Sequence, residues 1–225
     1  MMIWVIFIAF MLLGWLINYQ LKSKFEKYSK IPTADGLTGR EVVEKMLRDN
    51  GITGVRIGSV EGRLTDHYNP KDRTINLSRE VYNGNSIAAA AVAAHECGHA
   101  VQHAKAYSML EMRSALVPVV SFASQWVQWL LLAGILLVNT FPQLLLAGII
   151  LFATTTLFSF ITLPVEIDAS HRALTWLRTS GITTSQTQGY AQDALKWAAY
   201  TYVIAALSSL ATLLYYIMIY MGRRN

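Results

Sequence analysis

Long uncharged apolar runs alternate with charged segments along this chain. Four of the runs approach or exceed the roughly 20 apolar residues that an α-helix needs to cross a bilayer. They are Met2–Tyr19, Leu116–Val138, Leu144–Val165 and Ala198–Tyr220. The pattern therefore predicts four transmembrane helices. We expect the first to be a retained anchor, because no basic segment precedes it and four lysines follow it between positions 22 and 30.

The segment between the first two runs has the pattern of a small mixed domain, with short apolar periods separated by turn signals. Capping residues mark where its helices should begin, and β-favouring runs flank the turn signal at Asn69–Asp72. The expected elements are a helix capped by Thr38, a strand over 55–60, a hairpin formed by Leu64–Tyr68 and Arg73–Leu77, and a helix over Ile87–Lys105 that begins after Ser86.

Composition and charge support a membrane protein. The chain of 225 residues is 53% hydrophobic and 15% charged, which is more apolar than one water-soluble core requires. A disulfide framework is excluded because Cys97 is the only cysteine. The net charge of +5 does not indicate a nucleic-acid partner, because Lys and Arg are distributed according to the apolar runs and gather in the polar segments between them.

The distribution of Lys and Arg also predicts an orientation. Fourteen of them lie between positions 20 and 115 and three between 166 and 197, whereas the connection 139–143 has none and the tail has two. The positive-inside rule then places both polar segments in the cytoplasm and both termini outside. A pair of spans always returns the chain to its starting side, so residues near 95 and near 166 can meet.

The helix predicted over Ile87–Lys105 carries the motif His95-Glu96-Cys97-Gly98-His99. Two histidines four positions apart lie on one helix face, so both imidazoles can reach one metal ion. Catalytic zinc binds neutral imidazole at about 2.0–2.1 Å and leaves a position for water. Glu96 projects from the flank of that face and is predicted to accept the water's proton and deliver it to the leaving amine.

A third protein ligand is needed, since catalytic zinc has three in its usual sites. His103 lies about 12 Å from His95 along the helix axis, at 1.5 Å per residue, which is too far to share the ion. His67 approaches only if folding brings its strand near. Glu166 and Asp168 directly follow the third span, where an ionisable residue is typically functional. We expect Glu166 to be the ligand.

At this point the chain resembles the YugP-like neutral zinc metallopeptidases of bacterial membranes and, more distantly, HtpX-type gluzincins. The resemblance covers essentially the whole chain and is carried by Thr65–Tyr68, Ser86–Ala89, His95–Gln102 and Leu163–Ser170. It implies a zinc ion held by His95, His99 and Glu166, with Glu96 as the catalytic base. It also implies a zincin-like fold for the small domain and a place in the bacterial inner membrane.

One position departs from the HtpX-type pattern. Those proteins have an aspartate four residues after the third ligand, where this chain has Ser170. Asp168 is then a candidate for the missing acceptor that orients an imidazole. His67 and Tyr68 either line the substrate cleft and stabilise an oxyanion or are ordinary strand residues, and His103 is a further cleft candidate.

The expected fold class is a mainly α membrane protein in which four transmembrane helices carry a small α+β zincin-like domain between the first and second spans. The expected division is 1–21 anchor, 22–115 zincin-like domain, 116–165 transmembrane hairpin, 166–197 segment with the third ligand, and 198–225 last span and tail.

The leading functional hypothesis is a membrane-embedded zinc endopeptidase whose site faces the cytoplasm and whose partners are the lipid bilayer and protein or peptide substrates near it. An intramembrane site-2-type protease is the first alternative, although that class places the motif inside a span and pairs it with an aspartate. A non-catalytic metal-binding scaffold or sensor is the second, and such a protein has no need of Glu96.

Overall fold

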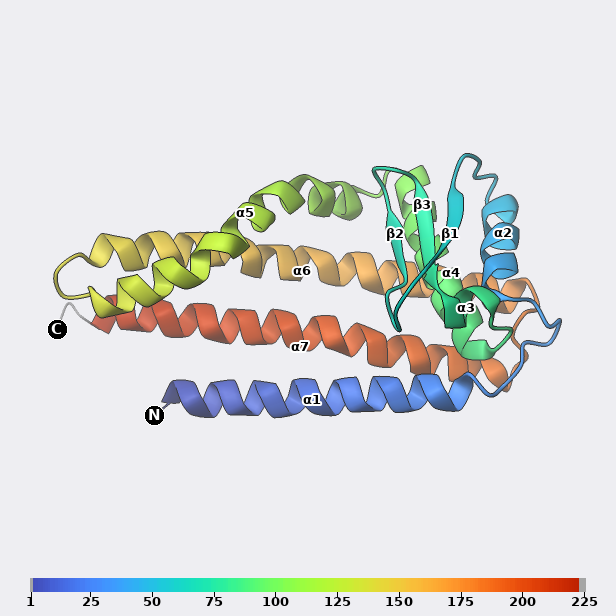
Figure 1. Ribbon diagram of the computed structural model, residues 1–225, viewed down its shortest axis with the longest axis horizontal. Coiled ribbons are helices and arrows are strands. Elements are labelled where there is room, and N and C mark those ends of the chain that lie inside the picture. Colours follow the sequence, from blue (N-terminus) through green and yellow to red (C-terminus); the bar gives the residue numbers. More distant parts are fainter. Residues whose placement is uncertain (1, 223–225) are drawn as a thin grey trace. The chain divides into compact units, whose positions relative to one another are not determined.

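The computed structural model describes residues 2–222, and the chain divides into two compact units. Unit 1 comprises Met1–Leu16, Glu111–Leu163 and Thr201–Asn225, and unit 2 comprises Ile17–Leu110 and Pro164–Tyr200. The elements, labelled in Figure 1, are α1 (Met2–Tyr28), α2 (Gly39–Asp49), β1 (Arg56–Val60), β2 (His67–Asn69), β3 (Thr74–Ser78), α3 (Arg79–Asn83), α4 (Ile87–Ala104), α5 (Ser108–Leu136), α6 (Pro142–Thr179) and α7 (Thr187–Gly222). Mainly helical structure with one small sheet was the expected class.

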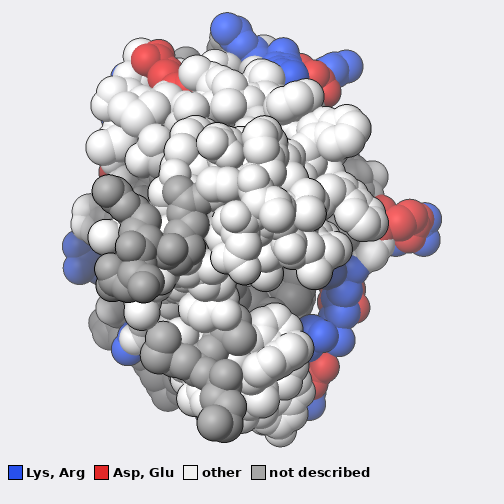
Figure 2. Space-filling view, turned by 90° about the vertical axis from the view of Figure 1, so that its left-hand side faces the viewer, with Lys and Arg blue, Asp and Glu red and all other residues white. Residues whose placement is uncertain are grey.

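Unit 1 is built from the apolar parts of four helices. By length and composition, α1, α5, α6 and α7 can each cross a membrane, as predicted. Glu111 and Arg113 are the only Asp, Glu, Lys or Arg residues among the described residues of unit 1. Large apolar side chains such as Trp4, Trp129 and Leu136 are exposed. In Figure 2 the described side chains at the centre of the view are uncharged.

Two glycines allow α5 and α6 to pack closely within unit 1. A Cβ atom at Gly134 would lie 2.5 Å from Cα of Leu145, and one at Gly148 would lie 3.0 Å from the Leu131 side chain. Leu131, Leu145 and Ile149 form the buried centre of this contact. The two helices therefore pair as the hairpin that the sequence predicts.

Unit 2 contains a three-stranded sheet in the order β1-β3-β2. The β2 and β3 strands pair antiparallel with Tyr68 opposite Ile75, which confirms the predicted hairpin. The β1 strand pairs parallel with β3, which the sequence pattern did not specify. Figure 1 shows β3 between its two neighbours. The β2 edge strand and β3 both contact α4, the helix that carries the metal-binding motif.

The helices of unit 2 begin where their capping residues predict. Thr38 and Glu41 form a reciprocal capping box at the start of α2. The Ser86 hydroxyl accepts a hydrogen bond from the Ala89 backbone N–H at the start of α4. The alanines that follow Ser86 are buried, and their small side chains let neighbouring elements approach the α4 backbone closely. The motif helix is therefore an interior element.

All four long helices extend beyond the spans expected from hydropathy at one or both ends. The α1 helix runs on to Tyr28 because Phe25 and Tyr28 are buried in the core of unit 2. The α6 helix continues through Pro164 to Thr179, so the segment expected to begin at position 166 starts as helix. Its inner face is a buried stripe at four-residue spacing, formed by Val165, Ala169, Ala173 and Leu177.

Candidate metal centre

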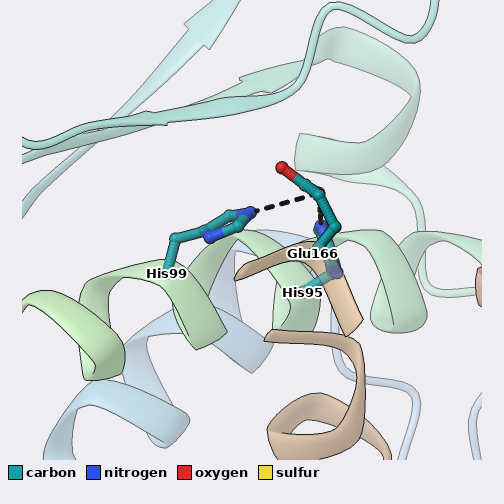
Figure 3. A group of neighbouring side chains, drawn as sticks. All are labelled: His95, His99 and Glu166. Atoms are coloured by element: carbon teal, nitrogen blue, oxygen red, sulfur yellow. Dashed lines mark hydrogen bonds and ion pairs between the residues drawn. The ribbon is translucent and has the colours of Figure 1, made fainter. Parts of the chain in front are cut away.

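Three predicted ligands come together in unit 2. His95 and His99 lie one turn apart on α4, and Glu166 projects from α6 toward both rings (Figure 3). Glu166 Oε2 lies 3.2 Å from His95 Nε2 and 3.6 Å from His99 Nε2. Two ligands of tetrahedral zinc at about 2.05 Å are separated by roughly 3.3 Å. The two distances from Glu166 are close to that separation, and the three donor atoms lie within 4.8 Å of one another, so this group could hold a metal ion.

Close packing of two helices brings Glu166 to the histidines. A Cβ atom at Gly98 would lie 2.6 Å from the backbone oxygen of Ala169, so only glycine permits the observed approach of α4 and α6. Ala169 belongs to the buried stripe on α6, and Glu166 lies three positions before it. The third candidate ligand is thus carried by a helix whose register against α4 is set by backbone contact.

Gln102 determines which nitrogen of His99 faces the cluster. The Gln102 amide N–H groups donate to the Val165 carbonyl oxygen and to Asp168 Oδ2, each over 2.8 Å. Both partners are acceptors, so the amide oxygen of Gln102 must face His99 Nδ1, 3.0 Å away. His99 Nδ1 therefore carries a proton, and in the neutral ring Nε2 presents its lone pair to Glu166. This is the tautomer that a metal ligand needs.

Ser170 occupies the corresponding place beside the other imidazole. Its hydroxyl oxygen lies 3.1 Å from His95 Nδ1, one helical turn after Glu166. Ser170 therefore provides the polar contact that we had expected from Asp168. Asp168 accepts a hydrogen bond from Gln102, whose amide oxygen faces His99 Nδ1. Its role in orienting an imidazole stays a prediction.

The electrostatics of the cluster favour a cation. Burial opposes protonation of His99, but the hydrogen bond and charge of Glu166, the charge of Glu96 and the hydrogen bond to Gln102 together raise the pKa of the ring. When both Nε2 atoms are unprotonated, they and the carboxylate oxygen are all acceptors, and their convergence then favours a bound cation. The donor set of two imidazoles and one carboxylate suits zinc.

Glu96 and Asp66 place two further carboxylates near the cluster. Glu96 is 8% exposed and follows His95 on α4. Burial raises the pKa of Asp66, and the charge of Glu96 raises it further, although Ser78 donates a 2.7 Å backbone hydrogen bond to Asp66. The sequence analysis did not single out Asp66 as a carboxylate near Glu96. Cys97 is fully buried, and burial raises the pKa of its thiol, consistent with packing rather than metal binding.

The remaining predicted cleft residues lie on or beside β2. His67 is exposed, with Nδ1 2.8 Å from the Thr65 carbonyl oxygen and Nε2 3.1 Å from Asn76 Nδ2. The Tyr68 hydroxyl lies 2.7 Å from His103 Nδ1. Within residues 2–222, none of His67, Tyr68 and His103 belongs to the three-residue cluster. Their part in substrate binding stays a prediction.

Comparisons with known proteins show which family this chain matches. Residues 3–221 match a family model described as "Putative neutral zinc metallopeptidase". The chain is 43% identical over 208 residues to the "Putative membrane protease YugP" of Bacillus subtilis (strain 168), and the match covers 92% of each protein. The comparison with solved structures found no match.

Proposed function

This chain belongs to the neutral zinc metallopeptidase family represented by that model, and we propose that it is a membrane-embedded zinc endopeptidase. One observation carries the proposal. The Nε2 atoms of both motif histidines converge on a Glu166 oxygen, while their Nδ1 atoms contact Gln102 and Ser170. This arrangement suits a metal ion, and the buried Glu96 carboxylate beside it favours a peptidase over a metal-binding scaffold, which has no need of that residue.

His95, His99 and Glu166 would hold the ion. Bound zinc would supply Lewis acidity, which polarises a peptide carbonyl and makes water a stronger acid near neutral pH. The Glu96 carboxylate accepts the proton of the attacking water and passes it to the leaving amine nitrogen. Gln102 keeps the His99 proton on Nδ1, and Ser170 contacts His95 Nδ1, so both rings are held during this transfer.

The apolar helices of unit 1 support a multi-pass membrane location. Exposed Trp, Phe and Leu side chains on long helix segments with few charged residues are favourable in lipid and unfavourable in water. The positive-inside rule places the charged segments of unit 2 in the cytoplasm of a bacterial cell. The substrates are then proteins or peptides that reach the cytoplasmic face of the inner membrane.

The direct test is hydrolysis of fluorescein-labelled casein by detergent-purified, zinc-loaded protein. Glu96→Gln should reduce the rate about 10²–10⁴-fold, the usual contribution of a general base, while leaving zinc content unchanged. Glu44→Gln serves as a matched control, because it removes the same charge from an exposed position on α2. Full activity in Glu96→Gln, or no hydrolysis of casein by the wild type, would count against the proposal.

A further inference from the structure

Unit 2 contains a cavity of about 440 Å³ that is lined in part by Ala100 and His103 of α4, the helix that carries the metal-binding motif. The loop after α2, the β2 strand, the residue before β3 and the last turns of α4 form its walls. The polar and charged side chains that line it include Asn50, Thr53, Tyr68, Arg73, His103 and Lys105. We call this the basic cavity. None of the three candidate ligands lines it, and Glu96 does not either, so it is distinct from the metal centre.

The charges of the basic cavity have one sign. Arg73 and Lys105 are exposed at its wall, and none of the lining residues is acidic. Over residues 2–222, neither Arg73 nor Lys105 forms an ion pair. Two unpaired cations at one cavity indicate an anionic ligand.

The Tyr68–His103 pair adds a hydrogen-bond donor. A hydroxyl and a neutral imidazole carry one polar hydrogen each, and the 2.7 Å contact between Tyr68 Oη and His103 Nδ1 uses one of them. If the hydroxyl donates, His103 keeps Nε2–H, and if Nδ1–H donates, Tyr68 keeps its O–H. In both arrangements the half-buried pair retains one donor for a ligand.

The basic cavity is adjacent to the place where a substrate would react. His103 follows His99 by one turn of α4, about 6 Å along the axis. Tyr68 lies on the β2 edge strand, two residues after Asp66, whose pKa responds to the charge of Glu96. An extended peptide advances about 3.3 Å per residue. Two residues of an extended peptide would therefore span the axial distance between His99 and His103.

We propose that the basic cavity binds a carboxylate of the peptide substrate, held by Arg73, Lys105 and the Tyr68–His103 pair. This inference rests on the proposed peptidase function and adds a substrate class to it. The carboxylate has two possible sources, a C-terminal carboxylate and an Asp or Glu side chain near the scissile bond. In the first case the enzyme prefers the ends of chains, and in the second it prefers acidic sequences.

Peptide binding to the zinc-loaded Glu96→Gln protein tests the inference. The probes are four fluorescent Ala/Leu hexapeptides in two matched pairs. The first pair has a free C-terminus or a C-terminal amide. The second pair has an amidated C-terminus and one internal Glu or one internal Gln. Anisotropy in detergent at low salt gives each Kd. We expect the free acid or the Glu peptide to bind about fivefold tighter than its neutral match, with the difference shrinking as salt is added.

Charge-matched variants assign the effect to the cavity. Arg73→Gln combined with Lys105→Gln should abolish the preference for the carboxylate. Arg56→Gln combined with Lys71→Gln removes the same charge from exposed positions outside the cavity and should preserve it. Equal loss in both double variants, or equal binding of charged and neutral peptides, would overturn the inference.

Hydrolysis of the same four peptides by the wild type separates the two claims. Cleavage without any charge preference would overturn the carboxylate site and leave the proposed peptidase standing. Cleavage that favours the free acid or the Glu peptide, with the preference lost in the Arg73→Gln, Lys105→Gln protein, would support both. If no peptide is bound or cleaved, both claims fall.

Discussion

At the scale of single residues, Gln102 is the side chain on which the His99 tautomer depends. Replacing it with Leu removes the acceptor for His99 Nδ1–H and leaves the Val165 carbonyl without its Gln102 donor. Loss of such an outer contact typically weakens metal affinity about 10–100-fold. We therefore expect Gln102→Leu to raise the zinc Kd by that factor in competition with a chromophoric chelator.

A glutamine on the surface provides the control for this substitution. Gln186 is exposed in the connection between α6 and α7, so Gln186→Leu makes the same chemical change away from the cluster. Its zinc affinity should equal that of the wild type. If Gln102→Leu also binds zinc with unchanged affinity, the hydrogen bond to His99 does not position the ring.

The sequence predicted the three clustered side chains, but it did not predict all of their contacts. His95 and His99 follow from helix spacing alone, and Glu166 follows from its place after the third span. Gln102 lies three positions after His99, on the same helix face, and that spacing is a signal that was available. The contact of Ser170 with His95 depends on the register of α6 against α4, which spacing does not encode.

At the scale of elements, the contact between α4 and α6 controls the geometry of the centre. Gly98→Ala places a Cβ against the Ala169 backbone oxygen, which cannot move without shifting α6. Overpacking of this kind typically costs about 1–3 kcal/mol of unfolding free energy. We expect that loss together with weaker zinc binding, because the shift also displaces Glu166. Thermal unfolding and chelator competition measure the two effects.

Gly189→Ala on α7 is the matched control. An added Cβ there meets no atom within 4 Å, so the change should be neutral or stabilise the helix by up to about 1 kcal/mol. A Gly98→Ala protein with wild-type stability and wild-type zinc affinity would show that the close approach of the two helices is not required.

The cap of α2 predicts a pH dependence of stability. The Thr38 backbone N–H and hydroxyl donate to the Glu41 carboxylate over 2.8 and 2.7 Å and lower its pKa. A lowered folded-state pKa gives stability that is present above the unfolded pKa, about 4.3, and is lost as the pH falls through the folded value. Glu41→Gln should therefore lower the Tm at pH 7, and this difference should shrink in acid.

Glu44→Gln on the same helix controls for the loss of one negative charge. Glu44 pairs with Arg40 and takes no part in the cap, so its substitution should leave the pH dependence nearly unchanged. If the Tm difference between the wild type and Glu41→Gln stays constant down to pH 3, the cap carboxylate does not stabilise α2.

Local sequence signals predicted where helices begin and where the hairpin forms. The full length of α1 and the pairing of β1 depend on contacts between residues far apart in the sequence. Thr38 and Ser86 cap their helices through neighbours within three residues, so the pattern was sufficient. The extension of α1 to Tyr28 depends on burial of side chains against other segments of unit 2. The parallel pairing of β1 with β3 joins residues 18 positions apart in a register that no local motif fixes.

At the scale of the whole molecule, the proposed orientation can be tested by labelling. Cys97 is buried and is the only cysteine, so Cys97→Ala gives a background for single exposed cysteines. In intact cells a membrane-impermeant maleimide should label Thr140→Cys, between α5 and α6, and should not label Thr184→Cys, between α6 and α7. Both should react after the cells are opened.

The reverse labelling pattern would place the charged segments outside the cytoplasm. Reaction of both cysteines in intact cells would mean that α6 does not separate them across a membrane. In either case the metal centre within unit 2 is unaffected, because the contacts that form it lie in that unit.

The measurement that tests the central claim most directly is zinc content per chain, by elemental analysis of protein purified without chelators. We predict about one zinc per chain in the wild type, Glu96→Gln and Asp168→Ala proteins, and loss of zinc in Glu166→Ala, because one of three protein ligands is then missing. A Glu166→Ala protein that keeps its zinc while Asp168→Ala loses it, or a wild type that holds no zinc and cannot be reloaded, would contradict the account.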